Sequence, residues 1–170
     1  MEMRNYELKD LLLTGIKSEI EAAKVYMRTA NNARNPFLKA KLKALAEEEE
    51  QHRELLENLF KELYPNQDIV LPENPEYLPE FPEIKLFAEL NGVTDVRKII
   101  EQAMKAELSA KKYYEELSNI VKDEKIKKLI LYMAKIEEGH YYILQREYRE
   151  IEEFESIMKD EDYIQFDAIF

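Results

Sequence analysis

The sequence predicts an all-α fold, a four-helix bundle made of two helix pairs that are joined by a long crossover. Three observations predict it. Only three of the 170 residues are glycine, which favours long helices over many tight turns. Apolar residues recur at alternating steps of three and four along four stretches of the chain. Five of the six prolines fall between Tyr64 and Thr94. We therefore expect one domain, 1–170, in which this proline-rich segment separates two helical halves.

The first helix pair is expected at residues 5–64. The stretch NNARNP interrupts the helical pattern, and within it Asn35 is a suitable N-cap, followed by Pro36 at the first helical position. The two helices should therefore span about 5–32 and about 36–64.

The second helix pair is expected at residues 94–158, after a crossover at 65–93. Thr94 and Asp95 are both suitable caps, and the pattern breaks again near Lys122 and Asp123. This predicts helices at about 94–121 and about 124–158. The crossover is long enough to run the full height of a bundle, which would make the second and third helices parallel, and it could equally reach a neighbouring subunit. A C-terminal tail, 159–170, is aromatic enough to pack against the protein.

The composition excludes several classes of function. The formal net charge is −11, so no basic surplus exists to neutralise the phosphates of a nucleic acid or of an anionic membrane. No stretch approaches the length of apolar residues that a membrane-spanning helix needs, and the N-terminus lacks the apolar segment of a signal peptide. The chain has no cysteine, which excludes disulfides, thiolate metal sites and thiol nucleophiles. We expect a cytoplasmic protein with no nucleic-acid or membrane partner.

Polar residues interrupt the core-facing positions of the second helix. Those positions are Leu38, Leu42, Leu45, Glu49, His52, Leu56, Leu59 and Leu63. One glutamate and one histidine therefore share a stripe with six leucines. The neighbouring acids Glu47, Glu48 and Glu50 are expected to point elsewhere, as charged residues in a helix usually face water.

The same pattern recurs in the other helices. The fourth helix carries Glu137 and His140 at its core-facing positions, the first helix carries Glu19 and Tyr26, and the third carries Glu107 and Tyr114. The equivalent residues are always 88 positions apart: 19 and 107, 26 and 114, 49 and 137, 52 and 140. The two halves are therefore an internal repeat whose polar core positions stay in register.

These six glutamates and histidines together predict a site for two metal ions. Four converging carboxylates would each cost several kcal/mol to bury without a partner. None of the core-facing positions carries a lysine or arginine that could neutralise them, and protonating all four demands large upward pKa shifts. Two divalent cations would balance the four charges. Residues three apart share a helix face, so each Glu-x-x-His pair can reach the same pair of ions.

The stretches SEIEAAKVY, AEEEEQHREL, AELSAKKYY and KIEEGHYYI resemble the ferritin-like superfamily and, within it, the rubrerythrin-related proteins. The resemblance covers roughly residues 5–150. It implies a ferritin-like bundle in which Glu19 and Glu107 are single-glutamate ligands and Glu49 and Glu137 are bridging or chelating ligands. The imidazole ligands would be His52 and His140.

The resemblance also gives roles to two tyrosines and marks two departures. Tyr26 and Tyr114 resemble tyrosines that orient ligand carboxylates, although an interpretation as plain core aromatics stays equally open. Typical rubrerythrins carry a cysteine-ligated rubredoxin domain, which a cysteine-free chain cannot form, so electrons would come from a separate carrier. They also carry a further glutamate at the position of Ala110, which matches Ala22 in the first half, so a more symmetric site is expected.

The resemblance implies an oxidoreductase with two iron ions, manganese being possible, because carboxylate and imidazole suit both metals. Its reaction would be the reduction of hydrogen peroxide or dioxygen to water, with electrons from an external donor protein, in defence against oxidative stress. One alternative is a ferroxidase for iron storage or detoxification. A further alternative is a metal-free helical interaction module. We expect a homodimer, in which helices could be exchanged between subunits.

Overall fold

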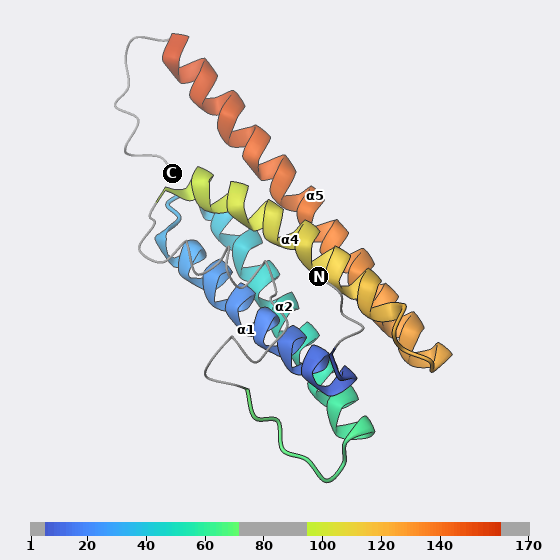
Figure 1. Cartoon of the computed structure of the whole chain (residues 1–170). Helices are drawn as coiled ribbons and strands as arrows, with labels where there is room; N and C mark the ends of the chain where they lie inside the picture. Colours follow the sequence, from blue (N-terminus) through green and yellow to red (C-terminus); the bar gives the residue numbers. More distant parts are fainter. Residues whose placement is uncertain (1–5, 72–94, 161–170) are drawn as a thin grey trace.

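The computed structural model describes residues 6–71 and 95–160, in which the chain forms four long helices. They are α1 (Leu8–Asn32), α2 (Pro36–Leu63), α4 (Val96–Ser118) and α5 (Glu124–Asp160). The predicted all-α bundle of two helix pairs is confirmed (Figure 1). Most of the expected crossover and the tail after residue 160 lie outside the described residues. No helix in the described ranges is long and apolar enough to cross a membrane.

The side-chain caps that the sequence predicts are present. The Asn35 side chain accepts hydrogen bonds from the backbone N–H groups of Phe37 and Leu38, and that of Asp95 accepts from Lys98. These bonds satisfy donors that a helix N-terminus leaves unpaired. Asp123 does the same for Lys125 and Ile126 at the start of α5.

Several helix ends differ from the expected positions; α1, for example, begins at Leu8 rather than near residue 5. α4 ends at Ser118 rather than near residue 121, because the chain turns there through hydrogen bonds from the N–H groups of Asn119 and Ile120 to Glu116 and Leu117. α5 continues to Asp160 and extends past the ends of the other helices in Figure 1.

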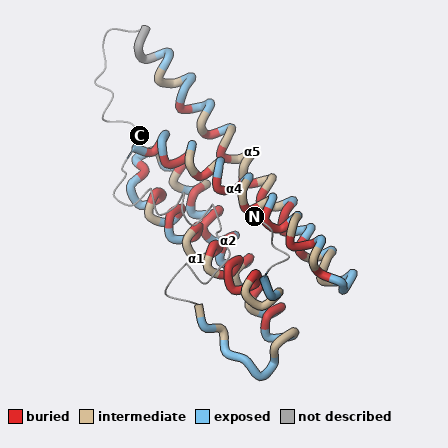
Figure 2. The backbone as a smooth tube through the Cα atoms, in the orientation of Figure 1, coloured by how far each residue is buried: buried red, intermediate tan, exposed pale blue. Residues whose placement is uncertain are grey.

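The helices within each pair are antiparallel and closely packed, α1 with α2 and α4 with α5 (Figure 1). The two pairs meet mainly through side chains. Figure 1 also shows that α2 and α4 run in the same direction, as expected if the crossover spans the height of the bundle. Buried residues line the sides of the helices that face one another (Figure 2).

The apolar core consists of two clusters, one on each side of the bundle's middle. One cluster contains Leu12, Leu56, Tyr114 and Ile130, and the other contains Leu42, Ile100 and Leu144. The six glutamates and histidines predicted to bind metal lie between these clusters along every helix. Their surroundings are therefore poor in water, and any charge placed there interacts strongly with its neighbours.

Candidate metal centre

Each helix brings part of the predicted site to the middle of the bundle. α1 provides Glu19, α2 provides Glu49 and His52, α4 provides Glu107, and α5 provides Glu137 and His140. All six residues are buried, with relative exposures of 5% or less. The structure therefore brings together all six residues that the sequence singled out.

The six residues form two groups of four that share two members. Glu19, Glu49, His52 and Glu137 make one group, and Glu49, Glu107, Glu137 and His140 make the other. Within each group, one ligand atom from every residue lies within 4.8 Å of the others. Two metal positions that share Glu49 and Glu137 follow from this arrangement.

The two shared glutamates have the geometry of bridging ligands. Glu49 places Oε2 at 3.1 Å from Nδ1 of His52 and Oε1 at 3.0 Å from Nδ1 of His140. Glu137 places Oε1 at 3.1 Å from Nδ1 of His52 and Oε2 at 3.5 Å from Nδ1 of His140. Each carboxylate therefore offers one oxygen to each group.

The other two glutamates belong to one group each. Glu19 lies 3.6 Å from Nδ1 of His52, and Glu107 lies 3.6 Å from Nδ1 of His140. The second oxygen of each accepts a hydrogen bond from a tyrosine: Tyr114 donates to Glu19, and Tyr26 donates to Glu107. Each carboxylate is thus held with one oxygen turned towards the centre. The two tyrosine rings also pack in the two apolar clusters, so they serve both as core aromatics and as donors.

The pKa values indicate which of the central glutamates and histidines are protonated when no metal is bound. Burial raises the pKa of Glu107 to about 8, and burial together with the charge of Glu137 raises that of Glu19 well above its usual range. Burial disfavours protonated His52, but its close contacts with the carboxylates of Glu137, Glu19 and Glu49 outweigh this effect and raise its pKa to about 12.

His140 behaves in the same way: burial opposes its protonation, yet contacts with Glu107, Glu137 and Glu49 raise its pKa. Burial also opposes ionisation of Glu49 and Glu137, but the two imidazoles close to these carboxylates outweigh it and lower both pKa values. Near neutral pH, protonated His52 therefore faces the ionised carboxylates of Glu49 and Glu137, and Glu107 keeps its proton. The pKa of Glu19 is shifted in the same upward direction as that of Glu107.

The residues present fit a pair of divalent cations. Four buried ligand atoms have no hydrogen-bond partner of acceptable geometry within the described residues: Glu49 Oε1, Glu107 Oε2, Glu137 Oε1 and His140 Nδ1. Each of them faces the centre, and a polar atom buried in this way is costly unless something binds it. The carboxylate and imidazole donors suit iron and manganese alike.

Another buried acid on α5 shows how a buried carboxylate is commonly neutralised without a metal ion. Glu147 forms an ion pair with Lys41 of α2, so its charge is neutralised by the protein itself. Within the described ranges, the recorded ion pairs of the four central glutamates are with histidine alone. A lysine partner thus distinguishes a structural buried acid from the acids of the centre.

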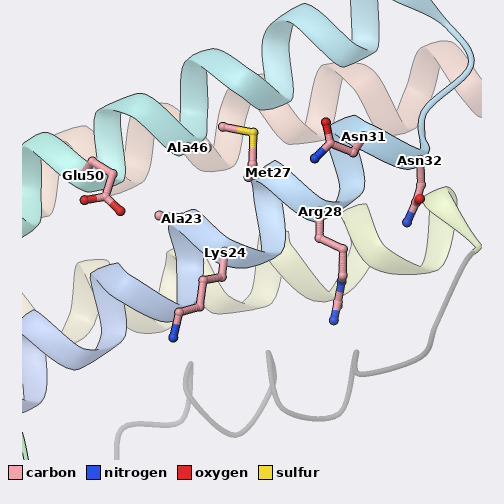
Figure 3. A pocket seen from close by; sticks show the side chains of 8 residues that line it. All are labelled: Ala23, Lys24, Met27, Arg28, Asn31, Asn32, Ala46 and Glu50. Carbon is pink, nitrogen blue, oxygen red and sulfur yellow. The ribbon is translucent and has the colours of Figure 1, made fainter.

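A surface pocket of about 520 Å³ lies elsewhere, over α1 and α2. Figure 3 shows Ala23, Met27 and Ala46 where these helices face each other, and Lys24 and Arg28 projecting away from α2. None of the six central residues lines it. In the second half, Lys111 occupies the position equivalent to Ala23 and pairs with Glu138 at 2.6 Å. We assign the pocket no part in the chemistry of the centre.

One contact of the centre was not predicted: Glu48 lies at an exposed position, as the helical pattern predicts, but its carboxylate also reaches His140. Its side chain is 47% exposed, yet Oε2 lies 2.8 Å from Nε2 of His140. The sequence prediction missed it because the helical pattern assigns Glu48 to a solvent-facing position, whereas a glutamate is long enough to reach back to the edge of the core. The expected symmetry holds for the six central residues and breaks here.

Comparison with known proteins agrees with this geometry. The rubrerythrin family model matches residues 10–148 and, in a second match, residues 98–170. The chain belongs to the rubrerythrin family. A hypothetical protein from Pyrococcus furiosus is similar in structure to this rubrerythrin-family chain, with a TM-score of 0.72 and 38% sequence identity over 87% of this chain and 92% of that one. No curated protein matches the chain. The family and the buried cluster of glutamate and histidine together indicate a di-iron protein.

Proposed function

We propose that this rubrerythrin-family chain is a di-iron oxidoreductase that reduces hydrogen peroxide, or dioxygen, to water with electrons from a separate donor. The observation that carries the proposal is the sharing of Glu49 and Glu137 between two buried carboxylate–imidazole groups. Such sharing would hold two ions close enough to act on one small molecule.

The chemistry of the bound metal is simple to state. Two ferrous ions would supply two electrons, the number that one molecule of hydrogen peroxide takes up, with two protons, to form two molecules of water. The residues of the chain hold and insulate that pair. The glutamates balance its charge, Tyr26 and Tyr114 fix the two unshared carboxylates, and the apolar clusters limit the access of bulk water.

The electrons for repeated turnover would come from another protein. The chain has no cysteine, so it cannot hold the thiolate-bound iron that passes electrons in related proteins with a rubredoxin domain. An external carrier is therefore part of the proposal.

Metal content tests the centre first. Protein loaded anaerobically with ferrous iron and freed of excess should hold about two irons per chain, the number that six such ligands bind in ferritin-like centres. His52→Leu should lower this number, and Glu47→Gln, a change at an exposed acid on the same helix, should leave it unchanged. A folded protein with a ratio near zero would instead support a metal-free interaction module.

Rapid mixing of the loaded protein with an oxidant tests the reaction. We expect oxidation of the iron by one equivalent of hydrogen peroxide per chain, and a slower response to dioxygen if peroxide is the physiological oxidant. Repeated oxidation of added ferrous iron without another reductant would contradict the proposal and favour a ferroxidase. Growth of a mineral core would favour iron storage.

A further inference from the structure

The two imidazoles of the centre differ in what holds their outer nitrogen. Nδ1 of His140 faces Glu49, Glu107 and Glu137. Its Nε2 lies 2.8 Å from the Glu48 carboxylate. Because a carboxylate can only accept, Nε2 is the protonated nitrogen, and the lone pair of Nδ1 then points to the centre once its proton is displaced.

Within residues 6–71 and 95–160, no carboxylate contact is seen for the outer nitrogen of His52. Its contacts with acidic side chains in the described parts of the chain are all made by Nδ1, to Glu19, Glu49 and Glu137. In the 88-residue register of the repeat, the position equivalent to Glu48 is Ile136, which cannot accept a hydrogen bond. In the part of the chain that the structure describes, the two halves therefore place the same ligands around the centre, but a carboxylate supports the outer nitrogen of His140 alone.

We infer that Glu48 is a positioning residue that makes the two metal positions unequal, so that the position of Glu107 and His140 binds its ion more tightly. The inference rests on the metal centre of the proposed function. A carboxylate that accepts from the outer N–H of a metal-binding histidine fixes the ring and makes its other nitrogen a stronger donor. Removing such a partner commonly lowers metal affinity by about 10- to 100-fold.

The surroundings of this contact allow an effect of that size. The His140 side chain is only 2% exposed, so its ring is held by the packed core and the hydrogen bond acts on an oriented group. The Glu48 side chain is 47% exposed, so it borders solvent. The carboxylate therefore needs no second partner inside the protein. The rings of His52 and His140 stack with their centroids 5.5 Å apart. The imidazole that Glu48 supports and that of His52 are therefore direct neighbours in the centre.

Cobalt(II) binding to the full chain tests the inference, because this ion is not oxidised by air under ordinary conditions and reports its ligands by its spectrum. Competition with a chromophoric chelator should resolve a tighter and a weaker step in the unaltered protein. Glu48→Ala should weaken the tighter step by about 10- to 100-fold and leave the weaker step unchanged. Glu48→Gln should have a smaller effect, because its amide oxygen still accepts from Nε2–H. Glu47→Gln removes the same charge one residue away and should behave like the unaltered protein.

Proton NMR of the cobalt-loaded protein supplies a readout that general destabilisation would not produce. The paramagnetically shifted imidazole N–H signal of His140 should move and exchange faster with solvent in Glu48→Ala, while that of His52 should not change. Unchanged binding steps, or an equal loss at both steps, would overturn the inference while leaving the metal centre intact. A folded, unaltered protein that binds no cobalt would overturn the inference together with the centre itself.

Discussion

The hydroxyl of Tyr26 on α1 donates a hydrogen bond to the carboxylate of Glu107 on α4, in the other half of the chain. The equivalent contact in the repeat runs from α4 to α1, where the hydroxyl of Tyr114 donates a hydrogen bond to the carboxylate of Glu19. Each tyrosine thus lies on the same helix as one unshared glutamate and supports the unshared glutamate of the other half. These two crossed hydrogen bonds join the helix pairs directly beside the candidate metal centre.

Replacing either tyrosine should therefore affect both the fold and the metal affinity. Tyr26→Phe keeps the ring in its apolar cluster but leaves an oxygen of Glu107 without its donor, which should cost about 1–3 kcal/mol in the free energy of unfolding. It should also weaken metal binding, by about 10-fold or more, because the carboxylate is no longer oriented. Chemical denaturation and chelator competition measure the two effects.

Tyr113→Phe is the matched control. Tyr113 is equally buried, but its hydroxyl donates to the backbone carbonyl of Leu11 at 2.7 Å and not to a ligand glutamate. It should lose about 1 kcal/mol of stability with no change in metal affinity. Equal metal affinity in Tyr26→Phe and Tyr113→Phe would show that the crossed hydrogen bonds serve the fold alone.

The sequence predicted the parts of the centre that depend on helical periodicity. Glu49 and His52 share a face because they are three residues apart, and the repeat carried the same placement to Glu137 and His140. Asn35 and Asp95 were predictable as caps because capping depends on local sequence alone. The structure brings the six central residues together; their binding of metal stays a prediction.

The contacts between helices were not predictable in the same way. Periodicity places Tyr26 on the core face but does not say which carboxylate across the bundle its hydroxyl meets. It also places Glu48 towards solvent, whereas the length and flexibility of this side chain bring its carboxylate to His140. Such contacts depend on the distance between helices and on side-chain rotamers, and one helical pattern contains neither.

Replacement of the two glycines in the described helices by alanine should have unequal effects on stability. A Cβ on Gly139 would meet no atom within 4 Å, so Gly139→Ala should raise the free energy of unfolding by about 0.5–1 kcal/mol through helix propensity. A Cβ on Gly15 would lie 3.1 Å from Leu56, whose side chain is fully buried. Gly15→Ala should therefore gain less or lose stability. Thermal unfolding of both metal-free variants decides this, and a larger gain at Gly15 would contradict it.

Metal loading should release protons. Near neutral pH without metal, the raised pKa values of His52 and Glu107 keep both groups protonated, and the pKa values of His140 and Glu19 are shifted in the same direction. Divalent ions replace these protons, so we expect at least about two protons released per chain near pH 7. Titration calorimetry in buffers of different ionisation enthalpy measures the number. A release near zero would mean that ions bind elsewhere on the acidic surface.

The pH dependence of stability should change sign when metal binds. In the metal-free protein, the folded state holds more protons than the unfolded state on Glu107 between pH 4.5 and about 8, and on His52 between pH 6.5 and about 12. Stability contributed by these groups is therefore lost as pH rises, and the Tm of the metal-free protein should fall between pH 6.5 and 8. Metal competes with the same protons, so the stabilisation by a fixed concentration of free metal should grow over this range. Scanning calorimetry with and without metal measures both trends.

Parallel trends would mean that the metal does not replace protons on Glu107 and His52. The same comparison in His52→Leu should show a weaker fall in the metal-free protein, because one of the proton-binding groups is gone.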